Sequence, residues 1–197
     1  MWSKSHVMVL QDVSTYARGL NITPRDRNAL LFSCAVNAGA HVLWSALLNG
    51  ATLCLFDVRK QGLDSLPQWL AASEISLYAS VPTLFRHCME HLTQDLSFPK
   101  LRVILMVGEP LYASDVVLFK RLPAPRRVLV HRLGSTETGT ILWCFVDGQE
   151  LIPGTPALGL RPPGRTASRS GGAGPHVPVG LPPPGNEILL PARSAGR

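Results

Sequence analysis

The residues best suited to chemistry lie in one short segment, LGSTETG at 133–139, which directly follows a predicted strand. Three of its side chains carry hydroxyl groups, and Glu137 supplies a carboxylate of the kind that holds Mg²⁺ next to phosphate groups. Its two glycines lack a Cβ atom, so the backbone can approach a ligand closely. The segment therefore indicates a ligand-binding loop, although a polar β-turn without a ligand has the same composition.

A second segment, VGEPL at 107–111, also comes directly after a predicted strand. It is alternatively the lead-in to the following helix, with the Glu109 carboxylate close to the positive end of that helix. Ligands of α/β proteins bind where strands end and loops begin. Two such loops at neighbouring strand ends therefore favour a single shared crevice.

A metal site elsewhere in the chain is the main alternative to a ligand site at these two loops. His87 and His91 stand one turn apart on a predicted helix, with Cys88 and Glu90 beside them. This spacing can bind zinc, but the chain has no H-E-x-x-H sequence and no evident third ligand. We therefore interpret the two histidines as solvated surface side chains.

Helices and strands must alternate to position the two loops. Apolar positions at helical spacing predict helices, and short continuous apolar runs predict buried strands. Asn49-Gly50 is typical of a helix end, and Asp147-Gly148 is typical of a hairpin turn. In chain order we expect a helix capped by Ser5, strand 30–34, helix 37–48, strand 52–56, a helix after Asp64 or Ser65, strand 75–79, helix 82–92, strand 103–107, helix 115–122, and strands 128–131, 141–146 and 150–152.

This alternation predicts an α/β fold with a mostly parallel sheet and helices on both of its faces. Residues 1–152 form the predicted domain core. Residues 153–175 are rich in proline, glycine and arginine, which predicts a flexible segment. Residues 176–197 contain one further predicted strand, at 187–190, and are expected to be an end of the same domain.

One stretch is long enough to cross a bilayer, because no Asp, Glu, Lys or Arg occurs between Asn28 and Phe56. Polar residues recur within it at every fourth position and predict a wet or functional stripe along one side of a helix. A buried strand–helix–strand unit explains the stretch without a membrane span. The polar positions are Ser33, Asn37, His41, Ser45 and Asn49.

The charge distribution and the cysteines argue against a nucleic-acid-binding protein and against a protein held together by disulfides. The net charge is +6, but most of the excess comes from five arginines at 161–197, so no folded basic face for nucleic acid is expected. The four cysteines have no C-x-x-C spacing, and no signal peptide precedes them. We expect a reduced, cytoplasmic protein.

Taken together, the motifs resemble the adenylate-forming superfamily, which comprises AMP-dependent synthetases and ligases, acyl-CoA synthetases and the adenylation domains of nonribosomal peptide synthetases. The two loops look like two core motifs of that superfamily. Further matches occur in the same order along the chain, and only residues 153–175 lie outside the resemblance. They are TPRDRNALLFS at 23–33, SALLNGATLCLFD at 45–57, ASVPTLFRH at 79–87, LRVILMVGEPL at 101–111 and VPVGLPPPGNEILL at 177–190.

The resemblance implies a ligase that works in two steps. A carboxylic acid attacks the α-phosphate of ATP with Mg²⁺ present, which gives an acyl-adenylate, and a thiol then takes the acyl group. The acceptor implied is CoA or phosphopantetheine, the latter on a carrier-protein domain.

The resemblance also implies site residues for the nucleotide. Glu137 would ligate Mg²⁺, and Thr136 would contact phosphate; these two are the expected catalytic residues. Leu133 stands where the family usually has a tyrosine that stacks on adenine, so the stacking is expected to be lost or weakened. The expected nucleotide-binding residues are Gly108, Glu109, Pro110, Leu133, Gly134, Ser135 and Thr136.

A pocket for the acid is implied in the same way. Asn37 takes the place of an aspartate that binds the substrate's ammonium group in amino-acid-activating members. A neutral amide forms no such ion pair, which favours a fatty, aryl or hydroxy acid. His41 is alternatively a core histidine bonded to backbone. The expected lining residues are Asn37, Ala38, His41, Val107, Arg132, Thr140 and Ile141.

Several family motifs do not occur in the sequence. The phosphate loop with its lysine is not found before His6, and the ribose-binding aspartate, the hinge and the small C-terminal domain are not found after the last match. We therefore expect a central fragment of the large domain that is inactive alone. The alternative is a non-catalytic remnant or a partner-binding module built on the same core.

Overall fold

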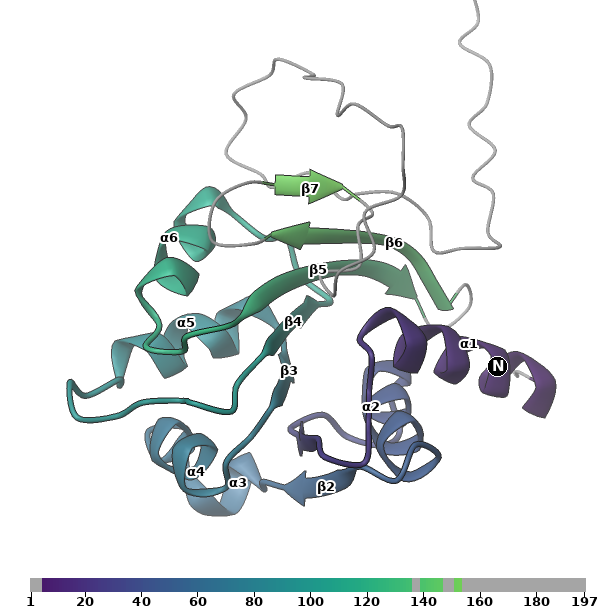
Figure 1. Cartoon of the computed structure of the whole chain (residues 1–197), viewed down its shortest axis with the longest axis horizontal. Helices are drawn as coiled ribbons and strands as arrows, with labels where there is room; N and C mark the ends of the chain where they lie inside the picture. Colours follow the sequence, from purple (N-terminus) through teal and green to yellow (C-terminus); the bar gives the residue numbers. More distant parts are fainter. Residues whose placement is uncertain (1–4, 136–138, 147–150, 154–197) are drawn as a thin grey trace, which may run out of the picture.

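A computed structural model describes residues 5–135, 139–146 and 151–153 of the chain. Within them, helices and strands alternate as the sequence predicts, except that a short helix at 58–61, which was not predicted, precedes the helix after Ser65 (Figure 1). The elements are, in chain order, α1 His6–Gly19, β1 Arg27–Leu30, α2 Asn37–Leu47, β2 Thr52–Leu55, α3 Val58–Gln61, α4 Leu66–Ala72, β3 Leu77–Ser80, α5 Pro82–Glu90, β4 Val103–Val107, α6 Ala113–Arg121, β5 Val128–Ser135, β6 Gly139–Val146 and β7 Leu151–Pro153.

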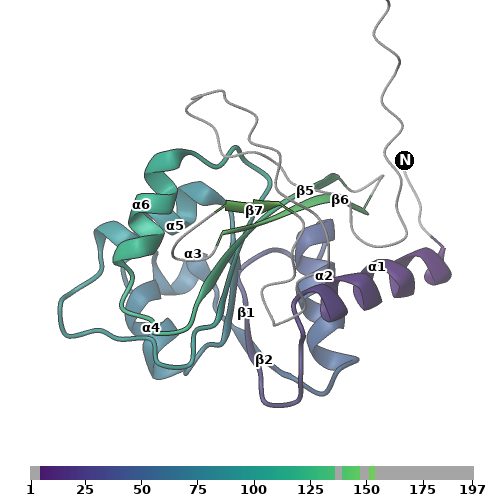
Figure 2. The same ribbon diagram turned by 45° about the horizontal axis from the view of Figure 1, so that its top comes forward.

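The strands form one seven-stranded sheet in the order β2-β1-β3-β4-β5-β6-β7. The first five strands of this order run parallel, and β6 and β7 are antiparallel to their neighbours. Helices α1 and α2 cover one face of the sheet, and α4, α5 and α6 cover the other (Figures 1 and 2). The predicted α/β class, with a mostly parallel sheet between helices, is confirmed.

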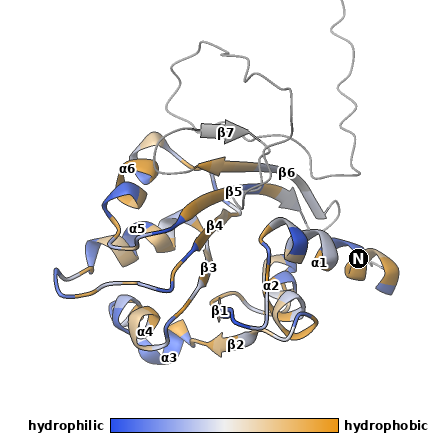
Figure 3. Ribbon diagram, in the orientation of Figure 1, coloured by the Kyte–Doolittle hydropathy of each residue, from blue (hydrophilic) through white to orange (hydrophobic). Residues whose placement is uncertain are grey.

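Alternate side chains of each central strand enter opposite halves of the core. On β4, Val103 and Leu105 pack on the α1–α2 side, whereas Ile104 and Met106 pack on the side of α5 and α6. All five residues of β4 are buried, which is why the strand is continuously apolar (Figure 3). The central strand is therefore rigidly held, and the loop that follows it starts from a fixed point.

Strand β1 differs from the prediction, because it spans Arg27–Leu30 and not residues 30–34. The apolar run alone suggested the later start. The hydrophilic residues at the true start are accommodated: Arg27 Nε donates to Ser73 O at 2.6 Å, and Asn28 is buried. The pairing register joins β1 to β3 at one position, Asn28 with Leu77, whereas β3 and β4 pair at four.

Strand β5 is longer than predicted and continues through Ser135, and β6 starts at Gly139. The two ends of the LGSTETG segment therefore belong to an antiparallel pair of strands, in which Ser135 lies opposite Gly139. Residues 136–138 of the predicted loop lie outside the described part of the chain. The predicted Asp147-Gly148 turn and the strand at 187–190 also lie outside it.

The polar stripe of α2 faces inward, so the predicted wet stripe is wrong for its central members. His41 and Ser45 are buried, and Asn49 Nδ2 donates to Ser45 O at 2.8 Å. In the described ranges, no helix combines the length and the apolar character needed to cross a membrane. The four cysteines are free thiols.

Candidate functional site

Both predicted loops lie at the same edge of the sheet, where the parallel strands end. Strand β4 ends at Val107, which pairs with Arg132 of β5, so Leu133 lies one register step further along, beside Gly108. Gly108 has φ +90°, a left-handed conformation that side chains disfavour, and an added Cβ would touch Val81 at 3.5 Å. Leu133 and Pro110 are exposed. This edge is called the carboxyl edge below.

The carboxylate of Glu109 is already engaged. Its Oε2 accepts from Thr83 Oγ1 at 2.6 Å and from Thr83 N at 3.0 Å. Thr83 lies in the first turn of α5, so Glu109 satisfies a free N–H at the start of that helix. The segment does lead from β4 into α6, as the alternative held, but the helix start to which Glu109 bonds is that of α5.

The two glycines of the LGSTETG segment serve the strand pair itself. A Cβ atom on Gly134 would lie 2.1 Å from Gly139 O, so only glycine allows the strands to close there. Gly139 has φ +69°, and its Cβ would lie 2.6 Å from Asp12 Oδ2. Glycine is thus required at position 134 because β6 approaches closely, and at position 139 because α1 does, whether or not a ligand is bound. Thr136 and Glu137 lie outside the described residues.

Helix α2 begins at the same edge. Asn37, its first residue, donates from Nδ2 to Ser135 O at 3.2 Å, which joins the start of α2 to the end of β5. Ala38 follows and is half-buried. The structure thus brings predicted acid-pocket residues next to a residue of the predicted nucleotide loop.

Arg132 and His41 form a buried pair behind this junction. Arg132 Nη1 lies 2.9 Å from His41 Nδ1, and the two residues are 3% and 2% exposed. Tyr16 packs against both: its ring stacks on His41, and the Arg132 guanidinium lies over its face at 5.5 Å. His41 therefore contacts Arg132, another predicted residue of the same pocket.

Burial sets the protonation behaviour of this cluster. Desolvation lowers the pKa of Arg132, although the nearby Tyr16 and Asp12 act in the opposite direction. Burial also raises the pKa of Tyr16 to about 12, so its hydroxyl stays neutral. Arg132 Nε is buried and has no hydrogen-bond partner among the described residues. A buried donor of this kind is available to an oxygen atom of a ligand.

The remaining predicted pocket residues lie on the central strands. Val107, at the end of β4, and Thr140, on β6, are both buried. Ile141 also lies on β6, but its side chain is outside the described part of the structure.

Three further residues complete the cluster around Arg132 and His41, and sequence reasoning did not assign them to the site: Asp12, Tyr16 and Trp143. Asp12 Oδ2 lies 3.9 Å from His41 Nε2, and Trp143 packs against Tyr16 with ring centroids 6.0 Å apart. Asp12 and Tyr16 are one turn apart on α1, so they share one face of the helix. That spacing was a usable signal, but only the fold shows that this face points toward β5 and β6.

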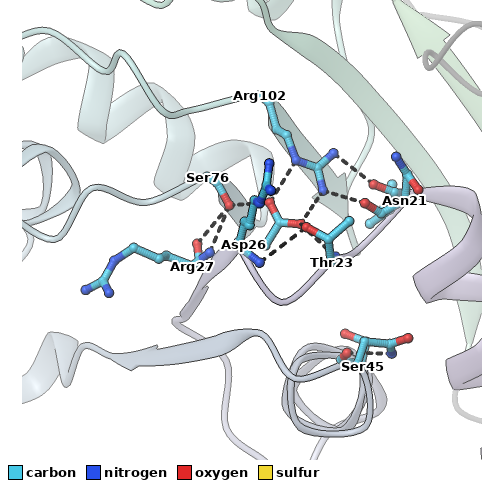
Figure 4. A network of polar contacts seen from close by, with 10 residues as sticks. Asn21, Thr23, Asp26, Arg27, Ser45, Ser76 and Arg102 are labelled. Atoms are coloured by element: carbon cyan, nitrogen blue, oxygen red, sulfur yellow. Dashed lines mark hydrogen bonds and ion pairs between the residues drawn. The ribbon is translucent and has the colours of Figure 1, made fainter.

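The opposite edge of the sheet, where the parallel strands begin, contains a cavity of about 450 Å³. Its centre is an ion pair: Arg102 donates to both carboxylate oxygens of Asp26, each at 2.8 Å (Figure 4). Ser76 Oγ and Thr23 also donate to Asp26. The contacts of Arg102 and Ser76 tie the starts of β1, β3 and β4 together, and none of them reaches the carboxyl edge.

A family model described as AMP-binding enzyme matches residues 4–188. The chain belongs to this family. Among individual proteins, tyrocidine synthase 3 of Brevibacillus parabrevis is 32% identical to it over 117 residues, which are 59% of this chain and 2% of the synthase.

Solved structures agree with the AMP-binding family at the level of the fold. The adenylation domain AlmE of Vibrio cholerae, in complex with glycyl-adenosine-5′-phosphate, superposes with a TM-score of 0.65 at 18% identity, over 76% of this chain and 28% of AlmE. O-succinylbenzoate coenzyme A synthetase of Bacillus subtilis, with ATP and magnesium ion, gives 0.61 at 18% identity, over 74% and 29%. The chain thus spans less than a third of each of these proteins.

Proposed function

We propose that this chain contributes the nucleotide and acid site of an enzyme that activates a carboxylic acid as its acyl-adenylate. The observation that carries the proposal is the meeting of three segments at the carboxyl edge: the loop after β4, the end of β5 and the start of α2. In α/β proteins this edge is where ligands bind.

Two features of the described residues support nucleotide binding at this edge. Gly108 offers backbone without a side chain, and Leu133, which is 44% exposed, offers an apolar surface beside it. Adenine would lie against Leu133 and the loop Gly108–Pro110, next to Gly134 and Ser135. Thr136 would contact phosphate, and Glu137 would hold Mg²⁺, which neutralises charge on the phosphates during attack.

The reaction proposed forms one bond and breaks one. A carboxylate oxygen of the acid bonds to the α-phosphorus of ATP, and pyrophosphate leaves with the bonding electron pair. This chain's residues would contribute orientation and charge stabilisation. The acyl group would then pass to the thiol of CoA or of a phosphopantetheine on a carrier-protein domain.

The acid is proposed to lack an α-ammonium group, because Asn37 offers an amide at the start of α2. The buried N–H of Arg132 favours an acid that carries a second oxygen, such as a hydroxyl or carboxylate, at its far end. Ala38, His41, Val107, Thr140 and Ile141 would complete the pocket around it.

ATP binding to residues 1–197, measured by calorimetry with Mg²⁺, tests the nucleotide part. We expect Leu133→Asp to weaken binding about tenfold, which corresponds to about 1.4 kcal/mol, because it places a charge against the adenine. Leu55→Asp, at another exposed leucine on edge strand β2, should leave the affinity unchanged. Glu137→Gln should remove the dependence on Mg²⁺. Equal affinities for the Leu133 variant and the original chain would contradict the proposal.

A second candidate function is a non-catalytic module built on the same core. The observation that favours it is the dense packing of Arg132, His41 and Tyr16, which are almost completely buried. Pyrophosphate exchange into ATP, measured with a panel of carboxylic acids, separates the two functions. Exchange with any acid supports the enzyme, and a chain that neither binds ATP nor exchanges pyrophosphate supports the module.

A further inference from the structure

Three potential metal ligands meet on the surface beside α5, in a part of the molecule that the proposed function does not use. Asp64 lies between α3 and α4, His87 lies in the last turn of α5, and His91 follows the end of that helix. One ligand atom from each lies within 4.8 Å of the other two. The side chains are 78%, 30% and 37% exposed, so an ion in solution can reach them.

The sequence shows the two histidines but not the third ligand. Asp64 is 23 positions before His87, and packing of α4 against α5 brings the two together. Leu66 and Leu70 of α4 share the apolar core with Phe85 and Cys88 of α5, so the approach is fixed by buried side chains. The interpretation of His87 and His91 as simply solvated residues is therefore incomplete.

The distances suit a tetrahedral ion. Asp64 Oδ1 lies 3.0 Å from His87 Nε2 and 3.4 Å from His91 Nε2. Two ligand atoms that each lie about 2.1 Å from a tetrahedral Zn²⁺ are about 3.4 Å apart. The two distances from Asp64 Oδ1 are close to this value.

The orientation of His91 gives an independent argument. Its Nδ1 lies 2.9 Å from the backbone oxygen of His87. A carbonyl oxygen only accepts, so Nδ1 carries the proton, and Nε2 is the ring nitrogen that faces Asp64 Oδ1 at 3.4 Å. A bond from Nδ1–H to a backbone carbonyl is the usual way in which proteins orient a metal-binding histidine. This bond leaves Nε2 of His91 as the ring nitrogen available to a metal ion.

We propose that Asp64, His87 and His91 bind one divalent ion of the Zn²⁺ type, with solvent water as the remaining ligand. Two imidazole nitrogens and one carboxylate oxygen favour Zn²⁺ over Mg²⁺, which prefers oxygen ligands alone. The ion ties the segment between α3 and α4 to the end of α5, and it is separate from the Mg²⁺ of the proposed reaction.

Zinc binding to the complete chain without a polyhistidine tag tests the proposal, with competition against a chromogenic chelator as the measurement. We expect one Zn²⁺ per chain, and an affinity about a hundredfold lower in His87→Ala and in His91→Ala, the upper end of the loss seen when a metal site loses a supporting contact. Asp64→Asn should weaken binding about tenfold. Millimolar Mg²⁺ should not displace the zinc.

Two matched variants control for adventitious sites. His6→Ala removes an exposed histidine of α1, and Glu90→Gln removes a carboxylate next to the site; neither should change zinc affinity. Zinc should raise the melting temperature of the original chain, because it binds the folded state, but should not raise that of His91→Ala. Unchanged zinc affinity in the three ligand variants, or equal loss in His6→Ala, would overturn the proposal.

Discussion

At the scale of single residues, the carboxyl edge is built around glycines that leave room for neighbouring side chains. Gly139 is the sharpest case, because the Asp12 carboxylate occupies the space that its Cβ would take. Asp12 also faces His41. The absence of a side chain at Gly139 therefore lets α1 pack closely against the end of β5. The composition of the LGSTETG segment is thus explained partly by packing.

Gly139→Ala should destabilise the fold by more than backbone strain alone. Gly139 and Gly50 both have φ +69°, but an added Cβ at Gly50 meets Pro24 at an ordinary 3.5 Å. Gly50→Ala should therefore cost roughly 1–2 kcal/mol of unfolding free energy, the price of a left-handed side chain. Gly139→Ala should cost measurably more in urea unfolding, because Asp12 has to move.

Adding Asp12→Ala to Gly139→Ala gives the control for this prediction. With the carboxylate removed, the penalty of Gly139→Ala should fall to that of Gly50→Ala. An excess penalty that persists in the double variant would show that Asp12 is not its cause.

The positions of the two motifs could be predicted from single residues, but some of the residues that contact them could not. The two motifs at 107–111 and 133–139 were located from residue types and do reach one edge of the sheet. Asp12 and Asp64 were not assigned to any site, because each depends on how two helices pack, and sequence spacing does not encode such packing. The assigned roles of Thr136 and Glu137 stay predictions.

At the scale of elements, Glu109 links the loop after β4 to the start of α5. Glu109→Ala should lower the unfolding free energy by about 1 kcal/mol, the usual cost of losing a helix cap. Glu90→Ala, at the other end of the same helix, should be neutral or slightly stabilising, because a carboxylate there opposes the helix dipole. Urea unfolding of the two variants gives the comparison, and equal losses would contradict the capping role.

The order and type of the described elements were predictable except for the short helix α3, whereas several strand boundaries, those of β1 and β5 above all, were not. Strand β4 was correct to the residue, because its continuous apolar run is bounded by Arg102 and Gly108. Strand β5 was predicted too short, because Gly134 and Ser135 favour a loop locally, and pairing with β6 outweighs that preference. Long-range pairing of this kind leaves no local signal.

At the scale of the whole molecule, Asp26 and Arg102 hold together the starts of β1, β3 and β4. Burial alone would raise the pKa of Asp26, but hydrogen bonds from Arg102, Ser76 and Thr23 outweigh it and lower the pKa below its ordinary value. A group with a lowered pKa in the folded state adds stability above its unfolded pKa and loses it in acid.

Stability should therefore fall as the pH drops below about 4, the unfolded pKa of an aspartate, toward the folded value. Asp26→Asn should cost about 3 kcal/mol at neutral pH, as expected when a buried ion pair loses one partner, and should flatten this acid decline. Urea unfolding at several pH values measures both effects. Parallel pH curves for the original chain and the variant would refute the prediction.

Strands β1 and β3 pair at a single position, Asn28 with Leu77, so the sheet is weakened along the line between these two strands. Asn28 Oδ1 is buried there without a hydrogen-bond partner among the described residues, and the bridging contacts gather on the amino side, where Asp26 and Arg27 bond to Ser73, Ser76 and Arg102. Local unfolding occurs most readily where it breaks the fewest stabilising contacts. Backbone amides of β1 should consequently exchange with solvent deuterium sooner than those of β4.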